Sequence, residues 1–343
     1  MKWNVLSLTR RKALASVAAV ASMNGSSSRS LPSRLIPLRK SSSKELLVKL
    51  VLTRDRFFAL WRASISPHSA SRLASYTLNG EQQWSKNLVA AADAPLFDLI
   101  PAGSTEVMAV SCNLGSAQLL FTRYNYMGYT GESDVLPLHQ AVLAVAASAT
   151  TIYATDSATQ VWTKKFGGME AAMRLAAAFH APVIGGVKLP AVAMSAHFLG
   201  DHLVLLDHVK ARAVKLFSNG QRQEGRLIHP DIEAALQKQD ADVESRVRAL
   251  RITGIESAMT FPLSIARAAS DPAHGLWVIA KLQTGLIPII RFNSRLEVQD
   301  SLSIRVPQDS VIGDRPPGTL AVSLPTIALG FQEGFLTLAS DVE

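Results

Sequence analysis

The sequence has a single cysteine, no long apolar run, and no acidic residue before Glu45. One cysteine, Cys112, excludes an intramolecular disulfide, and its apolar neighbourhood predicts a small buried side chain. The longest apolar stretch, Ala13–Met23, is about half as long as a membrane-spanning helix requires. A disordered chain is also excluded, because hydrophobic residues make up 48% and charged residues 18% of the 343 residues.

The formal net charge of +8 is confined to the N-terminal part of the chain. Nine of the 35 lysines and arginines lie in residues 1–44, which contain no acid. The remainder therefore has 26 cations against 27 acids. A nucleic-acid-binding domain should have a basic surface in its folded part, so we expect no nucleic-acid partner.

The first 21 residues have the composition of an export signal. A basic start precedes the short apolar stretch, and the small residues up to Ala21 predict cleavage after that residue. Arg10 and Arg11, which follow Thr9, resemble the twin-arginine export signal, and this resemblance implies a periplasmic or secreted protein. An organellar transit peptide is the alternative, because such peptides are also rich in arginine and serine and poor in acids. Residues 22–44 contain nine serines and two prolines, which predicts a disordered linker.

One unit of short apolar strands repeats through residues 45–343. Its clearest copy has strands at His202–Asp207 and Arg212–Phe217, followed by the hairpin signal Asn219-Gly220. The preceding copy has strands at Thr151–Asp156 and Gln160–Phe166. The third strands of successive copies begin near residues 73, 118, 160, 212 and 287. The shorter intervals are close to the roughly 40–50 residues of a four-stranded propeller blade.

This repeat predicts a single all-β domain, a β-propeller of about six blades. A β-sandwich also has many short strands, but it does not repeat one unit in the same internal order. Helix-like spacing predicts short helical insertions near residues 169–180 and 230–250. The residues expected to pack between blades are Leu120, Ile152, Trp162, Leu205, Val214, Phe217 and Ile289.

The clearest copy is similar to the NHL-type repeats of six-bladed propellers. In those repeats an apolar strand ends in Asp, and a turn, a basic residue, a second apolar strand, Phe and a Gly turn follow. Here these positions are Asp207, Arg212, Phe217 and Gly220. The resemblance implies the propeller architecture only, since this fold serves binding proteins, lyases and lactonases alike.

The densest group of chemically active side chains lies between His197 and His208. His197, Asp201 and His202 are weak candidates for a metal site, because at most these three could meet across the first turn. Asp156 and Asp207 occupy the same place in successive copies, and an Asp at a strand end usually accepts hydrogen bonds from the following turn. We therefore expect a structural role for both, and no catalytic residue or cofactor is identified.

The innermost strands decide between two functions. They are expected at Leu46–Leu52, Pro95–Ile100, Ala141–Ala147, Ala191–Ala196, Phe261–Ala266 and Leu320–Leu324. Only Lys49, Asp98 and Arg267 are polar candidates for the central channel, which is too few for a metal site. This favours an exported binding or scaffold module for a protein, peptide or glycan over the alternative, a lactonase-like hydrolase or a lyase.

The last blade is predicted to be incomplete. Its strands would include Thr326–Phe331 and a segment from Glu333 to Asp341, after which the chain stops at Glu343. The segment Leu35–Arg39 is short and contains Pro37, so it is not expected to fill the gap. An apolar edge strand would be left exposed. The sequence then predicts either a truncated chain or an edge covered by a partner or a second copy.

Replacing Arg10 and Arg11 by lysine should retain the protein in the cytoplasm, because the twin-arginine route requires both arginines. Cell fractionation with immunodetection measures the change. N-terminal sequencing of the exported protein should give Ser22 as the first residue, and an intact Met1 in the final compartment would contradict the prediction.

Overall fold

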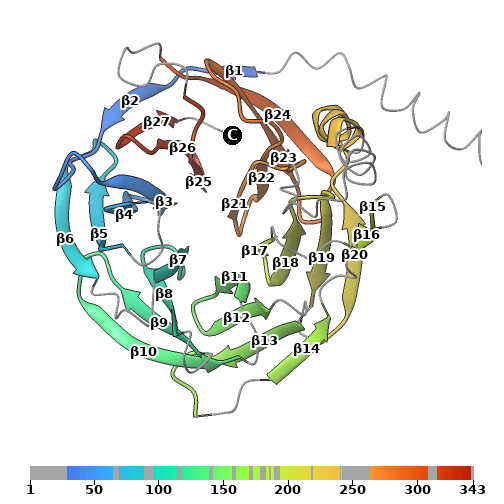
Figure 1. Cartoon of the computed structure of the whole chain (residues 1–343), viewed down its shortest axis with the longest axis horizontal. Helices are drawn as coiled ribbons and strands as arrows, with labels where there is room; N and C mark the ends of the chain where they lie inside the picture. The colour runs from blue at the N-terminus through green and yellow to red at the C-terminus, as the bar shows by residue number, and fades with distance from the viewer. Residues whose placement is uncertain are drawn as a thin grey trace, which may run out of the picture.

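The computed structural model describes residues 29–340, apart from residues 65–68, 89–95, 114–117, 139–141, 157–159, 170–172, 178–182, 185–186, 189–193, 218, 240, 242–262 and 308–314. Six antiparallel sheets stand around a central axis like the blades of a propeller (Figure 1). The predicted all-β propeller of six blades is confirmed.

Within each blade the strands follow one another from the axis outward. The first three blades consist of β3 (Leu46–Leu52), β4 (Arg56–Arg62), β5 (Ser71–Thr77) and β6 (Gln82–Leu88); β7 (Leu96–Pro101), β8 (Val107–Asn113), β9 (Gln118–Tyr124) and β10 (Thr130–Pro137); and β11 (Val142–Ala147), β12 (Thr151–Asp156), β13 (Gln160–Lys165) and β14 (Met173–Ala177). A small hairpin of β15 (Val183–Ile184) and β16 (Val187–Lys188) follows.

The other three blades are built in the same order. They consist of β17 (Met194–Leu199), β18 (His202–Asp207), β19 (Arg212–Leu216) and β20 (Arg222–Arg226); β21 (Arg267–Asp271), β22 (Gly275–Ile279), β23 (Leu286–Phe292) and β24 (Val298–Arg305); and β25 (Thr319–Ser323), β26 (Thr326–Phe331) and β27 (Phe335–Ala339). The predicted hairpin turns form at Gly80 and Gly220, where φ is +87° and +80°, a backbone conformation that glycine adopts without strain.

The hydrophobic core is divided among the blade interfaces. Six clusters of buried side chains lie one between each pair of neighbouring blades. Among the side chains predicted for these interfaces, Ile152, Leu205, Val214 and Ile289 are fully buried. Phe217 and Trp162 are only partly buried, and Leu120, on the face of β9 opposite to the buried Leu119 and Phe121, is 38% exposed.

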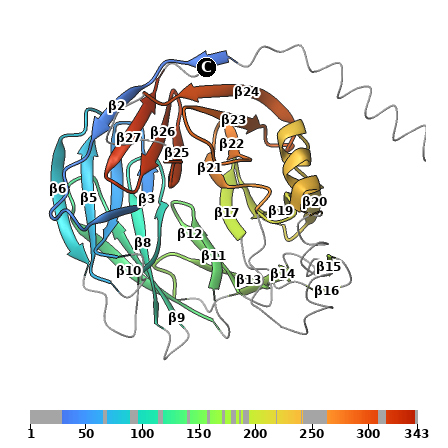
Figure 2. The same ribbon diagram turned by 45° about the horizontal axis from the view of Figure 1, so that its top comes forward.

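The N-terminal segment closes the ring. The strand β2 (Arg34–Pro37) pairs antiparallel with β27 and becomes the fourth strand of the last blade, and β1 (Arg29–Leu31) pairs in parallel with β24 (Figure 2). Ile36 and Leu38 enter the core between the last and first blades. The prediction of an incomplete last blade with an exposed apolar edge is therefore wrong.

The predicted linker over residues 22–44 also needs correction from Arg29 onward. Beyond the two strands, residues 39–45 are fixed to the first blade. Tyr76 donates a hydrogen bond to the carbonyl of Arg39 at 2.8 Å, and the buried Arg72 binds both carboxylate oxygens of Glu45 at 2.9 and 2.8 Å. Serines and prolines in this segment lie in turns and at an edge strand, where neither breaks a sheet.

The two predicted helical insertions have different outcomes. Residues 230–239 form a short helix whose Ile232 and Leu236 pack against the interface of the fourth and fifth blades. Near residues 169–180, by contrast, Met173–Ala177 forms the outermost strand β14, paired with β13. The innermost strand of the fifth blade is Arg267–Asp271 and not the expected Phe261–Ala266. In the part of the chain that the structure describes, no helix is long and apolar enough to span a membrane.

Replacing Ile36 by alanine should lower the free energy of unfolding by about 2–5 kcal/mol, because the side chain is 4% exposed at the closing interface. Leu120→Ala is the control, since the side chain is 38% exposed and its loss should cost less than about 1 kcal/mol. Urea denaturation measures both changes. Equal, small effects would show that β2 does not close the ring.

Candidate functional site

The innermost strands enclose a central cavity of about 780 Å³. This volume lies within the range of small-molecule sites, roughly 300–1,000 Å³. Aliphatic and small side chains make up most of its wall, as the sequences of β3, β11 and β25 require. The polar and charged side chains in this wall include Lys49, Arg62, Asp98, Ser195, His197 and Asp271.

An ion pair joins the first two blades at the cavity. Lys49 Nζ on β3 lies 3.0 Å from a carboxylate oxygen of Asp98 on β7. Both residues were expected at the channel, and both line the cavity. Arg267, the third expected residue, donates hydrogen bonds to the carbonyls of Gly318 and Ala266, each at 2.6 Å, and burial lowers its pKa.

The carboxylate of Asp271, which also lines the cavity, is already well hydrogen bonded. It accepts the N–H groups of Ala273 at 3.0 Å and Leu324 at 2.9 Å. His274 Nδ1 lies 2.9 Å from the same carboxylate. Asp271 therefore ties β21 to the turn after β25, and its lone pairs are engaged within the protein.

A serine lies between two histidines on the fourth blade. Ser195 and His197 are two residues apart on β17, so their side chains share one face of the strand. His208 follows β18 directly. The Ser195 Oγ lies 2.6 Å from His197 Nε2 and 2.7 Å from His208 Nε2.

The backbone around His208 determines where the protons lie in this group. His208 Nδ1 is 2.9 Å from the carbonyl oxygen of Ile265, which can only accept, so Nδ1 carries the proton. In the neutral ring Nε2 is then an acceptor, and the Ser195 hydroxyl donates to it. The remaining contact requires His197 Nε2–H to donate to Ser195 Oγ.

Both imidazoles are kept neutral. The pKa of His197 is lowered from 6.5 to about 3, mainly by burial and to a smaller degree by His208 and Lys49. Burial also lowers the pKa of His208, and the positive charges of Arg267 and Lys49 act in the same direction, while Asp207 and the hydrogen bond to Ile265 oppose it. The unfolded chain therefore binds more protons than the native one below pH 6.5, and these histidines reduce stability as the pH falls from 6.5 towards 3.

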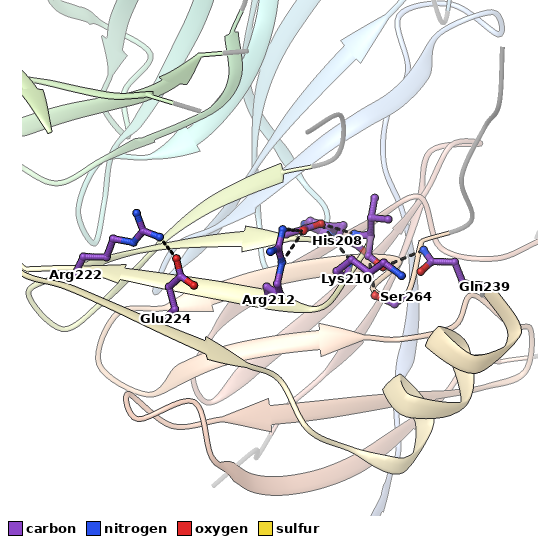
Figure 3. A network of polar contacts seen from close by, with 9 residues as sticks. His208, Lys210, Arg212, Arg222, Glu224, Gln239 and Ser264 are labelled. Carbon is purple, nitrogen blue, oxygen red and sulfur yellow. Dashed lines mark hydrogen bonds and ion pairs between the residues drawn. The ribbon is translucent and has the colours of Figure 1, made fainter. Parts of the chain in front are cut away.

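The strand-end aspartates hold the turns that follow them. Asp207 accepts the N–H groups of Val209 at 2.9 Å and Lys210 at 3.2 Å, and Arg212 binds its other oxygen (Figure 3). Asp156 accepts the N–H of Gln160 at 2.9 Å. These contacts are the turn-capping hydrogen bonds that the sequence pattern predicts for Asp156 and Asp207.

The three weak metal candidates make separate contacts. His197 is hydrogen bonded to Ser195, while His202 lies beside Asp201 and against the ring of Phe217, with the ring centroids 4.4 Å apart. Within the described ranges, no group of three or more His, Cys, Asp or Glu side chains could hold a metal ion. Burial raises the pKa of the Cys112 thiol, which makes it a poor nucleophile at neutral pH.

Sequence reasoning identified the histidine-rich segment but not the serine within it. The Ser-x-His pattern at residues 195–197 places both side chains on one strand face, and this signal was available. The approach of His208 depends on the hairpin register, in which Ser195 is directly paired with Leu206. The contact with Ile265 joins residues 57 positions apart, and no local pattern encodes it.

The histidine tautomers can be measured directly. Long-range ¹H–¹⁵N spectra at pH 7 should show His208 protonated at Nδ1 only and His197 at Nε2 only. On acidification His197 should remain neutral at pH 5, because its pKa is about 3. His274, which is partly exposed beside Asp271, serves as the internal comparison. A doubly protonated His197 at pH 5 would contradict the proposed proton arrangement.

Comparisons with known proteins identify the fold. No protein-family model matches the sequence, and no curated protein matches it. Among solved structures, a protein of unknown function from Bacteroides thetaiotaomicron is 8% identical, with a TM-score of 0.52 over 91% of this chain and 75% of that chain. Virginiamycin B lyase from Staphylococcus aureus is 10% identical, with a TM-score of 0.48 over 90% of this chain and 98% of that chain. The chain is therefore a six-bladed β-propeller whose resemblance to these and to NHL-type propellers lies in the fold alone.

Proposed function

We propose that this propeller is a binding protein whose central cavity takes a small, mostly apolar molecule carrying one anionic group. The observation that carries the proposal is the cavity of about 780 Å³ with an aliphatic wall and a few convergent polar groups. Such a combination is typical of sites for small organic ligands, in which apolar contacts supply affinity and polar groups fix orientation.

The charges of the wall indicate the polarity of the ligand. On the side of the first two blades, the cavity wall includes the cationic side chains of Lys49 and Arg62 and the carboxylate of Asp98, which is paired with Lys49. In the low-dielectric surroundings of a cavity a cationic side chain attracts an anionic group more strongly than it would in water. An anionic head beside Lys49 and an apolar body along the strands therefore fit the cavity together.

Export is part of the proposal. Cleavage after Ala21, which lies outside the described residues together with Arg10 and Arg11, would leave β1 and β2 in the mature chain, because β1 begins at Arg29. A mature protein would thus keep both strands that close the ring. A periplasmic or secreted binding protein is consistent with this arrangement, and a protein, peptide or glycan partner could also occupy the channel mouth.

A metal-dependent lactonase or lyase is the less favoured alternative. That chemistry needs carboxylates or histidines converging on a cation. Lys49 forms an ion pair with Asp98, and His197 and His208 are both hydrogen bonded to Ser195. The residues of the described wall are thus better arranged for an organic anion than for a metal ion.

Two fluorescent probes of one ring system test the proposal. 8-Anilinonaphthalene-1-sulfonate is anionic, and N-phenyl-1-naphthylamine is its neutral counterpart. Both should bind one per chain, and Lys49→Gln should weaken the anionic probe about tenfold, which corresponds to about 1.4 kcal/mol, while leaving the neutral probe within about twofold. Lys238→Gln is the control, because this exposed lysine lies on the helix of residues 230–239. Failure to bind either probe, or equal weakening by both variants, would overturn the proposal.

A further inference from the structure

We propose that Ser195 is a nucleophile for acyl transfer, with His208 as its general base, and that the central cavity hydrolyses a carboxylic ester with an apolar acyl group. This inference rests on the proposed function to the extent that the ester must enter the same cavity. It goes further because it assigns a reaction to the Ser195 hydroxyl, which ligand binding alone does not require.

The hydrogen bonding of Ser195 is that of an activated serine. A serine hydroxyl is a weak nucleophile unless a neutral base can take its proton. The Ser195 Oγ and His208 Nε2 are 2.7 Å apart, and the tautomer fixed by Ile265 leaves a lone pair on that nitrogen. Ser195 also lines the cavity, so a bound ester can reach its oxygen.

His208 is held in one orientation by the segment before β21. Its carbonyl oxygen accepts the N–H of Ser264 at 2.9 Å, the hydroxyl of Ser264 at 3.0 Å and the N–H of Ile265 at 3.1 Å. The Ile265 carbonyl in turn accepts from the His208 ring. Figure 3 shows His208 and Ser264 in contact in this network. The Ile265 carbonyl orients the His208 ring as a carboxylate orients the histidine of serine hydrolases, although it carries no charge to stabilise an imidazolium.

Gln239 supports this turn from the other side. This buried residue, at the end of the short helix, donates a hydrogen bond from Nε2 to the carbonyl of Val209 at 2.9 Å. The turn that follows β18 is therefore held by the helix end as well as by the segment at residues 264–265. The His208 ring, fixed by its hydrogen bond to Ile265, loses little freedom when it accepts a proton from Ser195, which favours catalysis.

A cationic side chain, Lys49, belongs to the same cavity wall as Ser195. It is near enough to lower the pKa of both His197 and His208. His197 Nε2–H donates to Ser195 Oγ and stabilises the oxygen as its proton leaves. A cation near the reacting carbonyl would stabilise the negative charge of the tetrahedral intermediate.

The reaction balances with water as the only co-reactant. Ser195 Oγ attacks the ester carbonyl, its proton passes to His208 Nε2, and the carbon–oxygen bond to the leaving alcohol breaks as that alcohol takes the proton from His208. Water then attacks the acyl-serine, giving its proton to His208. The carboxylic acid leaves, and Ser195 regains its proton. The sum is ester and water to acid and alcohol.

Labelling with a fluorophosphonate tests the nucleophile on the full mature chain. The serine oxygen displaces fluoride from phosphorus, so an activated Ser195 should gain one phosphonyl group, located by mass spectrometry of the peptide. Ser195→Ala should abolish labelling, and His208→Gln should slow it by roughly 10²–10⁴-fold. Ser85→Ala is the control, because Ser85 is exposed on β6, the outermost strand of the first blade, and is not among the residues that line the cavity.

The pH dependence separates a catalytic from a structural role. Asp207, Arg267, Lys49 and His197 are the charged and titratable groups that act on or face His208, and together with burial they give it a pKa below 6.5. The labelling rate should therefore remain flat from pH 8 to below pH 6.5 and then fall. A purely structural network would give no labelling at any pH.

Probe binding distinguishes the two proposals. If the chain binds 8-anilinonaphthalene-1-sulfonate but Ser195 is never labelled, the binding function stands and the acyl-transfer inference is overturned. Labelling that persists in Ser195→Ala, or that is lost equally in Ser85→Ala, would also overturn it. Folded Ser195→Ala that keeps its probe affinity and loses labelling is the expected result.

Discussion

The pairing of β2 with β27 is the contact on which the remaining structure depends. It supplies the fourth strand of the last blade and places Ile36 and Leu38 in the core between the last and first blades. Without it the edge of β27 would be unpaired, and the first and last blades would be joined mainly by side-chain packing and by the hydrogen bond from Leu47 N–H to the carbonyl of Gln332. The cavity depends on this closure, because all six innermost strands contribute to its wall.

The propeller could be predicted from the sequence because its evidence is local. Each hairpin has its own alternation and its own turn residues, as at Gly80 and Gly220. Closure could not be predicted in the same way. The strand β2 has four residues and contains Pro37, which argues against a central strand, but β2 is the outermost strand of its blade, where a missing N–H is tolerated. Likewise Met173–Ala177 has a helix-forming composition, and its pairing with β13 overrides that preference.

The candidate site shows the same difference between local features, which the sequence reveals, and long-range contacts, which it does not. Composition drew attention to the histidines between residues 197 and 208, among which His197, Asp201 and His202 were only weak candidates for a metal site. What decides their chemistry is long-range: the register that brings His208 to Ser195, the carbonyl of Ile265 that fixes the ring, and the charge of Lys49 from another blade. Burial then keeps both rings neutral, a condition that residue spacing alone does not reveal.

The strands that close the ring, β1 and β2, are synthesised long before the strands with which they pair. Ile36 pairs with Leu336, so β2 leaves the ribosome about 300 residues before its partner exists. At usual elongation rates of roughly 5–20 residues per second, that wait lasts roughly 15–60 s. During it the blades can form one after another, but β24 and β27 have not yet been made and the early strands have nothing to pair with. The ring can therefore close only once β27 has been made, and until then the edges that β1 and β2 will cover are unpaired.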